Sequence, residues 1–203
     1  QELTGISEEI ERLSDELRDS TLGIRMLPIG STFSRFRRVV RDLSADLGKE
    51  IELETEGADT ELDKTVIERL GDPLVHLLRN AIDHGIESPE ERERAGKSRL
   101  GKVVLSAMHS GGNVLLTIVD DGKGLDLDKL RQKGVERGLI SEGAELSDKE
   151  ITSLIFAPGF STASAVTDVS GRGVGMDVVR SNIESLRGTV EIESQPGLGS
   201  TVR

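Results

Sequence analysis

The sequence contains no cysteine, tryptophan or tyrosine, and it has only four phenylalanines among its 203 residues. The absence of cysteine excludes disulfide bonds and thiolate metal sites. The three histidines, His76, His84 and His109, do not have the spacing of a structural zinc site. We therefore expect any bound metal to be a hard ion with oxygen ligands. The scarcity of aromatic rings also argues against a protein that stacks the bases of a single nucleic-acid strand.

Basic residues are outnumbered, because 26 lysines and arginines stand against 37 acidic residues and give a net charge of −11. This balance argues against general affinity for nucleic acid, so an anionic nucleotide would need a local site. No apolar run approaches the roughly 18 residues of a membrane helix, and the first residues do not read as a signal peptide. We expect a cytoplasmic protein with one sizeable globular domain and a short appendage.

The most informative stretch is HLLRNAIDHG, residues 76–85. His76, Asn80 and His84 recur at every fourth residue, so a helix places them along one side, with Asp83 beside them. The opposite side is apolar and consists of Leu74, Leu77, Leu78, Ala81 and Ile82. A polar helix face turned toward water would give the same pattern, so this stretch alone does not decide between a site and a surface.

A second segment, IVDDGKG at 118–124, is an apolar run that ends in an acidic, glycine-rich turn. A carboxylate at the end of a strand can accept a hydrogen bond from the exocyclic amine of adenine, and Asp120 is the residue we assign to this role. Gly122 and Gly124 would let the backbone approach the base without an intervening Cβ atom. An acidic turn that closes a hairpin would explain DDG equally well.

A third segment, SGRGVGMD at 170–177, precedes an expected helix. Gly171, Gly173 and Gly175 can present successive backbone N–H groups to a triphosphate at the positive end of that helix. The segment is not a Walker loop, which needs GxxxxGK followed by Ser or Thr, and no strand directly precedes it as in a Rossmann motif. We interpret it as a nucleotide lid.

The order of these segments resembles the ATP-binding fold of the GHKL superfamily, shared by histidine kinases, type II topoisomerases, ninety-kilodalton heat-shock chaperones and mismatch-repair ATPases. HLLRNAIDHGIE, FAPGFST at 156–162 and VSGRGVGMDVV at 169–179 narrow the resemblance to the chemotaxis histidine kinases, over nearly the whole chain. The resemblance implies that Asn80 is a ligand of Mg²⁺. It also implies that His76 acts on or orients the acceptor imidazole, at a position where related ATPases carry a carboxylate base.

The resemblance extends the set of site residues. His84 and Lys129 become candidates for phosphate contact, Ser161 and Thr162 fall in a region that orders when ATP binds, and Ser200 lies where relatives more often have threonine near adenine. The complete set of expected ATP-binding residues is Asn80, Asp83, His84, Asp120, Gly122, Gly124, Lys129, Ser161, Thr162, Gly171, Gly173, Gly175 and Ser200.

The activity that the resemblance implies is phosphoryl transfer from MgATP to a histidine. The resemblance implies that the substrate histidine lies on a separate histidine phosphotransfer domain. The histidines of this sequence agree, since His109 lies beside an expected hairpin turn and the other two belong to the nucleotide site. The other expected partners are a second kinase subunit, a downstream response regulator, and an adaptor and chemoreceptors that would bind through regions absent here and place the protein at membrane receptor arrays.

Two alternatives remain open. One is a conformational ATPase of the chaperone or topoisomerase kind, which the absence of glutamate at position 76 disfavours. The other is a non-catalytic nucleotide-binding module that regulates another protein.

The predicted fold is an α/β sandwich of the Bergerat type, in the α+β class, with a mixed, mostly antiparallel sheet and one helical layer. Leu3, Ile6, Ile10, Leu13 and Leu17 alternate spacings of three and four, which predicts a coiled-coil helix over 2–26. Such a helix pairs either with a second subunit or with its own domain.

Pro28 and Gly30 predict a hinge after this helix. We therefore expect residues 1–28 to be the end of a dimerisation domain with its hinge. Residues 29–203 would then be the catalytic domain, cut short at its final strand.

Local patterns predict the remaining elements. Asp72 and Pro73 are typical of the start of the helix that carries the 76–85 stretch. The expected helices otherwise cover 32–47, 126–137, 147–155 and 176–187, and the expected strands cover 51–54, 103–109, 113–121, 189–194 and 200–203, with a long loop over 158–175. The strands at 103–109 and 113–121 are expected to form a hairpin with both faces buried.

Overall fold

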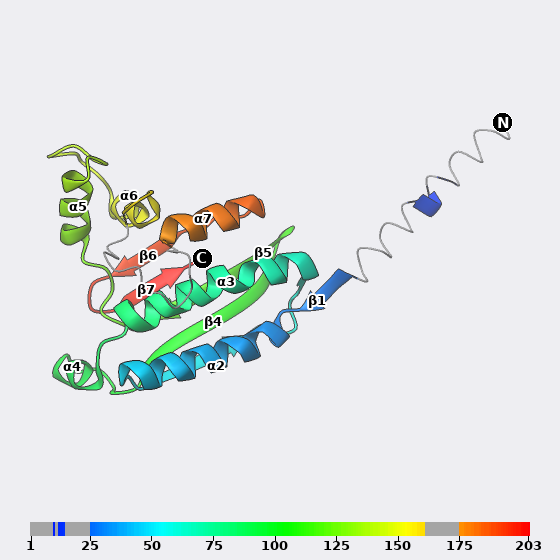
Figure 1. Cartoon of the computed structure of the whole chain (residues 1–203), viewed down its shortest axis with the longest axis horizontal. Coiled ribbons are helices and arrows are strands. Elements are labelled where there is room, and N and C mark those ends of the chain that lie inside the picture. Colours follow the sequence, from blue (N-terminus) through cyan, green and yellow to red (C-terminus); the bar gives the residue numbers. More distant parts are fainter. Residues whose placement is uncertain (1–9, 11, 15–24, 161–174) are drawn as a thin grey trace.

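The computed structural model describes residues 10, 12–14, 25–160 and 175–203. Within these ranges a five-stranded sheet is covered on one face by helices, which confirms the predicted α/β sandwich (Figure 1). The strands are β1 Met26–Pro28, β2 Ile51–Glu56, β3 Glu61–Asp63, β4 Gly101–Ser110, β5 Asn113–Asp120, β6 Ile192–Gln195 and β7 Gly199–Val202. The helices are α2 Gly30–Leu47, α3 Lys64–Asn80, η1 Ala81–Gly85, α4 Pro89–Arg94, α5 Leu127–Glu136, α6 Asp148–Ser153, η2 Leu154–Phe156 and α7 Met176–Ser185.

The sheet has the strand order β2-β4-β5-β7-β6. Strand β2 runs parallel to β4, and the other three pairings are antiparallel, so the sheet is mixed and mostly antiparallel as predicted. The predicted hairpin is confirmed, because β4 and β5 pair from Val103 opposite Asp120 to Ser110 opposite Asn113. This register places Asp120 at the end of a central strand.

The expectation that both faces of this hairpin are buried is wrong. Val103, Leu105 and Ala107 lie under the helices with at most 4% of their surface exposed, whereas Met108 is 56% exposed and Val119 37% exposed. The physical reason is that the described helices cover only one face, and an antiparallel sheet tolerates water on the other.

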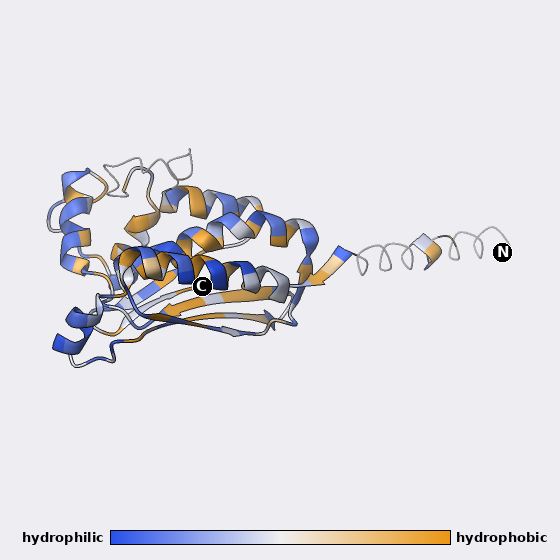
Figure 2. Cartoon of the chain, turned by 60° about the horizontal axis from the view of Figure 1, so that its bottom comes forward, coloured by the Kyte–Doolittle hydropathy of each residue, from blue (hydrophilic) through white to orange (hydrophobic). Residues whose placement is uncertain are grey.

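The helical layer is built around α2 and α3, which lie side by side in the same direction (Figure 1). Helix α2 buries Phe33 and Phe36, and its C-terminal cap is Gly48, whose φ of 62° is the left-handed conformation that glycine adopts easily. In Figure 2 the central strands are largely hydrophobic, while the short helix α4 is almost entirely hydrophilic. The core therefore lies between the sheet and α2, α3 and α7.

The predicted start of the helix that carries the 76–85 stretch is wrong. The structure begins α3 at Lys64, where the Asp63 side chain accepts a hydrogen bond of 2.7 Å from the Thr65 backbone and caps the helix. Asp72 and Pro73 lie inside α3 instead. Pro73 has no backbone N–H, so one hydrogen bond of the helix is missing there. The helix tolerates this loss because its apolar face is packed in the core.

The segment predicted as a hinge contains strand β1, which pairs with β3 through Met26 opposite Asp63. Neither three-residue strand was predicted. Of the helix predicted over 2–26, residues 10 and 12–14 are described and helical, with Ile10 and Leu13 exposed, and most of the others lie outside the described residues. The domain boundary after residue 28 stays a prediction.

The C-terminal elements follow the predicted order. Helices α5, α6 and α7 and strands β6 and β7 fall within the predicted ranges or a few residues of them. The loop predicted over 158–175 lies largely outside the described residues. Helix α4, which Ser88 and Glu91 start through a reciprocal capping box, was not predicted. None of the described helices combines the length and apolar character needed to cross a membrane.

Candidate functional site

The helix that carries His76 and Asn80 changes its winding directly after Asn80. Residues Ala81–Gly85 form a π-helical turn, closed by a hydrogen bond of 2.8 Å from the Ile86 backbone N–H to the Ala81 carbonyl. The four-residue spacing that holds on α3 therefore does not extend to His84, whose imidazole is 77% exposed. Such π-turns occur often at functional sites. The sequence pattern did not predict this one.

His76 is partly buried on α3. Burial, followed by the nearby charges of Arg79 and His84, lowers the pKa of its imidazole. A histidine with a lowered pKa is neutral near pH 7 and can accept a proton. The environment of His76 thus suits a proton-accepting or positioning role.

Asn80 connects the same helix to α7. Its amide nitrogen donates a hydrogen bond of 2.9 Å to the sulfur of Met176, the first residue of α7. This contact uses the nitrogen, so the amide oxygen is the atom that can bind a hard metal ion. Within the described ranges no group of three or more His, Asp or Glu side chains could hold a metal. A metal at Asn80 would therefore take most of its ligands from bound phosphates and water.

Asp120 ends strand β5 and is only 6% exposed. One of its oxygens accepts a hydrogen bond of 3.0 Å from the Gly122 N–H, and burial raises the pKa of the carboxyl to about 6. Throughout the described part of the chain no cation forms a salt bridge with it. A buried carboxylate without a cation and with a second oxygen to offer is suited to a neutral donor such as an amine.

The neighbouring Asp121 has a structural role. The guanidinium of Arg92, which is 1% exposed, donates to both oxygens of Asp121 at 3.1 and 2.8 Å and also contacts Glu87 at 3.3 Å. Asp121 also accepts from the Lys102 backbone N–H at 2.9 Å. Of the two aspartates in DDG, the second closes the turn and the first remains for a ligand. No sequence pattern indicates this cluster, because Arg92 stands in an ordinary charged run.

The glycines of this turn allow close backbone contacts within the protein. A Cβ atom on Gly122 would lie 2.2 Å from the Gly85 carbonyl oxygen, and one on Gly124, whose φ is 71°, would lie 2.3 Å from the Gln195 oxygen. The Lys123 N–H donates to the Gly85 carbonyl at 3.0 Å. These contacts hold the end of the π-turn against the Asp120 turn. A contact of Gly122 or Gly124 with a base stays a prediction.

We predict that Gly122→Ala lowers the free energy of unfolding by about 2 kcal/mol or more, because its methyl group would overlap a backbone carbonyl that cannot move freely. Thermal and urea unfolding measure this change. Gly112→Ala is the matched control, since nothing lies within 4 Å of a Cβ atom there and its φ is not positive. Equal stability of the two variants would contradict the close contact between the turn and Gly85.

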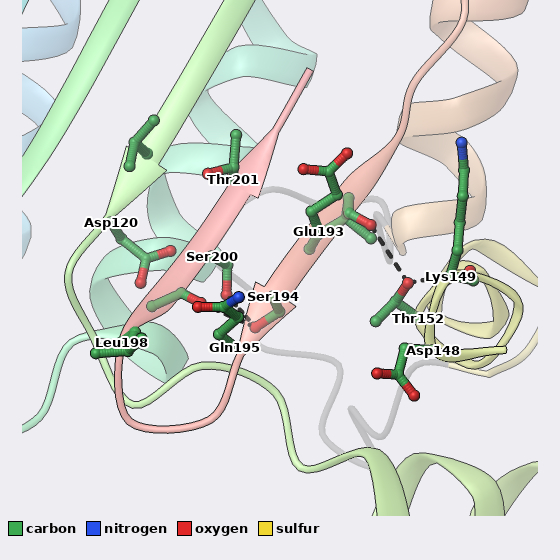
Figure 3. A pocket seen from close by; sticks show the side chains of 13 residues that line it. Asp120, Asp148, Lys149, Thr152, Glu193, Ser194, Gln195, Leu198, Ser200 and Thr201 are labelled. Carbon is green, nitrogen blue, oxygen red and sulfur yellow. Dashed lines mark hydrogen bonds between the residues drawn. The ribbon is translucent and has the colours of Figure 1, made fainter.

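Ser200 lies beside Asp120, because the two are paired in the register of β5 and β7. Its hydroxyl is 2.9 Å from that of Ser194 on β6. A cavity of about 500 Å³ opens at these strand ends. Figure 3 shows Asp120 and Ser200 on one side of it, with Lys149 and Thr152 of α6 across β6. Sequence reasoning missed Ser194 and the α6 residues, because neither belongs to a glycine motif.

His76 and Asn80 do not line this cavity. The π-turn that follows them on the chain reaches Asp120, because Gly85 at its end faces the Asp120 carboxylate and η1 contacts β7. The structure thus brings the helix of His76 and Asn80, the Asp120 turn, Ser200 and the start of α7 to one end of the sheet.

The remaining predicted residues lie at different distances from this centre. Gly175 directly precedes α7, next to Met176. Asp83 and His84 are exposed and lie 3.8 Å apart, and the exposed ammonium of Lys129 on α5 is 2.8 Å from Asp126. Ser161, Thr162, Gly171 and Gly173 lie outside the described residues. Their roles, like all individual ligand contacts, stay predictions.

Comparison with known proteins agrees with this geometry. Residues 68–203 match the family described as histidine kinase-, DNA gyrase B- and HSP90-like ATPase. The chain is 52% identical over 98% of its length to chemotaxis protein CheA of Bacillus subtilis, and 52% identical over 99% of its length to sensor histidine kinase CheAY of Helicobacter pylori. It spans only 30% and 25% of the length of these two relatives.

The fold is also found among solved structures. The catalytic domain of histidine kinase ThkA matches with a TM-score of 0.54 and 16% sequence identity, covering 87% of this chain and 90% of that one. At this identity the likeness concerns the fold alone.

Proposed function

The chain belongs to the histidine kinase-, DNA gyrase B- and HSP90-like ATPase family, and from this membership we propose that it is the ATP-binding catalytic part of a chemotaxis histidine kinase. The resemblance seen in its motifs and the predicted ATP-binding fold are confirmed. The reaction we propose is transfer of the γ-phosphoryl group of MgATP to a histidine on a separate phosphotransfer domain.

The observation that carries this proposal is the environment of Asp120. Its carboxylate is buried at a strand end, has no cationic partner in the described ranges, accepts a hydrogen bond from the Gly122 N–H and lies against Gly85. A buried charge is costly unless a donor satisfies it, and the exocyclic amine of adenine is such a donor. The residues present therefore fit an adenine nucleotide.

The phosphate side of the site is proposed from the motifs and from α3. The amide oxygen of Asn80 would take one position on Mg²⁺, which neutralises phosphate charge when it is bound. Gly175, at the start of α7, would present the positive end of that helix to the phosphates. His84 and Lys129 would contribute cationic or donor groups from the exposed side.

His76 would act on the acceptor. Its lowered pKa keeps the imidazole neutral, so it can accept a proton from the incoming histidine or hold that ring in position for in-line attack. The position carries an imidazole in place of the carboxylate that activates water in related ATPases, which favours a histidine acceptor over hydrolysis.

The partners we propose come from the relatives and not from contacts in this chain. They are the phosphotransfer domain as substrate, a second kinase subunit joined through residues 1–28, and a downstream response regulator. An adaptor and chemoreceptors would bind parts of the protein beyond this sequence and place the kinase at receptor arrays.

Incubation with γ-labelled MgATP tests the proposed function, with and without an added histidine phosphotransfer domain. Protein-bound label and released phosphate are measured in the same samples. We expect label on the added domain and little free phosphate. Phosphate release without label would identify a conformational ATPase instead. Binding of nucleotide with neither product would leave a regulatory nucleotide-binding module.

A further inference from the structure

Lys49 joins the end of α2 to the π-turn that follows Asn80. It comes directly after Gly48, and its side chain reaches residues more than thirty positions further along the chain. Its ammonium donates to the carbonyl oxygens of Ile82 at 2.8 Å, Asp83 at 2.7 Å and Ile86 at 2.7 Å. An ammonium has three N–H donors, so all of them are used in this turn.

The carbonyls that Lys49 binds need such a partner. At the end of a helix the last carbonyls have no intrahelical donor and carry the negative end of the helix dipole, which a cation stabilises. Burial lowers the pKa of Lys49, while the negative charge of Asp83 opposes that shift. The ammonium is thus drawn out of water to satisfy three backbone oxygens, an arrangement that fixes the turn in one shape.

The shape of this turn determines the distance between the two halves of the proposed site, the phosphate side at Asn80 and the adenine side at Asp120. Asn80 directly precedes the turn and Asp83 and His84 lie within it, while Gly85 at its end lies against the Asp120 carboxylate. The hydrogen bond from the Ile86 N–H to the Ala81 carbonyl defines the π-winding. Lys49 binds the carbonyls of Ile86 itself and of Ile82, the residue after Ala81. A return to α-helical winding would rotate Asp83, His84 and Gly85 relative to Asn80.

We infer that Lys49 is a positioning residue for the nucleotide, which it does not touch, because it holds the π-turn that sets Asn80 relative to Asp120. The inference rests on the proposed nucleotide site. Lys49 acts through backbone carbonyls, so its effect on affinity should be separable from its effect on overall stability.

Lys49→Met tests this inference, since methionine keeps an unbranched side chain and lacks the three donors. We expect the Kd for MgATP to rise at least about tenfold and hydrogen exchange at the Ile86 amide to speed up by a similar factor. Leu62→Ala, at a buried core position of β3, provides a destabilised variant in an element other than α2, which contacts the turn. Lys102→Met, which removes an ammonium paired with Glu54 on the sheet, controls for lost charge.

The cysteine-free sequence allows chemical rescue. Lys49→Cys introduces the chain's single thiol, and alkylation with bromoethylamine rebuilds an ammonium at nearly the original distance, whereas bromoethane adds a neutral group of similar size. We expect only the first reagent to return the Kd to within about threefold of wild type. This comparison remains decisive if Lys49→Met folds poorly.

Wild-type affinity in Lys49→Met, or an equal loss in a Leu62→Ala protein of the same stability, would overturn the inference while leaving the proposed function intact. Equal Kd values for MgATP in the neutral and the cationic adducts would overturn the inference as well. Absence of MgATP binding by the wild-type chain would instead contradict the proposed function, and the positioning role with it.

Discussion

Asp120→Asn is expected to weaken MgATP binding by at least about a hundredfold while making the nucleotide-free protein more stable. The carboxylate accepts backbone hydrogen bonds from Gly122 and Ser200, and its remaining lone pairs can accept from the adenine amine. An asparagine side chain has one acceptor oxygen, and its other terminal group is an NH₂ donor. Either the Gly122 N–H or the adenine amine would therefore face this NH₂ group and lack an acceptor. Leaving a buried donor unsatisfied costs about 1–3 kcal/mol in addition to the lost charge-assisted bond. Isothermal titration calorimetry measures the loss.

The gain in stability follows from the pKa of Asp120. The carboxyl has an ordinary pKa of 3.8 and a folded pKa of about 6, so the folded protein holds a proton between these values that the unfolded chain has released. Wild-type stability therefore falls as the pH rises through this window, by about 3 kcal/mol in total, and the whole cost is present above pH 6. Asparagine does not ionise and avoids this cost.

Thermal unfolding at several pH values checks the linkage. The advantage of Asp120→Asn should be several degrees at pH 7.5, shrink as the pH falls through 6, and vanish near pH 4. A variant that binds MgATP normally would show that Asp120 is not the adenine acceptor. A variant less stable than wild type at pH 7.5 would show that the ionised carboxylate of Asp120 does not lower the stability of the folded wild-type protein.

The elements that sequence predicted well are those determined by local pattern. Helix α2 carries a continuous apolar stripe through Phe33 and Phe36 and a glycine at its end, and both signals are read within the helix itself. The β4–β5 hairpin has apolar strands around Gly111 and Gly112. The position of Asp120 at the end of β5 was predicted for the same reason, since an acidic residue at the end of an apolar strand is a local feature.

The elements that sequence missed depend on contacts between distant segments. Strands β1 and β3 have three residues each and form only because 26–28 meets 61–63. The start of α3 was misplaced because Asp72 and Pro73 form a valid local start signal that tertiary packing overrides, while the true cap, Asp63, is the last residue of the unpredicted β3. Local periodicity carries no information on such pairings.

The same limit applies to the site. The motifs predicted Asn80 and Asp120 as site residues, but the π-turn lies between them, and Lys49, which follows a different helix, binds the carbonyls of that turn. Arg92 supports the Asp120 turn through Asp121 in the same way. Neither basic residue stands in a recognisable pattern, because a lysine or arginine that satisfies backbone carbonyls looks the same in sequence as one that faces water.

His76→Gln is expected to reduce phosphoryl transfer by about a hundredfold to a thousandfold with little change in MgATP affinity. Glutamine keeps a polar side chain of similar length on α3 but cannot accept a proton at neutral pH, and general base catalysis contributes about 10²–10⁴ to such steps. Transfer to an added phosphotransfer domain is measured in single turnover, with the Kd for MgATP measured in parallel. His109→Gln, at an exposed position of β4, is the matched histidine control.

The pH dependence of transfer separates a proton-accepting role from a purely structural one. Because burial and the charges of Arg79 and His84 lower the pKa of His76, the wild-type rate should stay constant near pH 7 and fall at a pH below the ordinary histidine value of 6.5. His76→Gln should lack this acid limb and show a low, flatter profile. Transfer by His76→Gln at the wild-type rate would remove His76 from the mechanism, and a reduced rate that keeps the acid limb would assign that titration to another group.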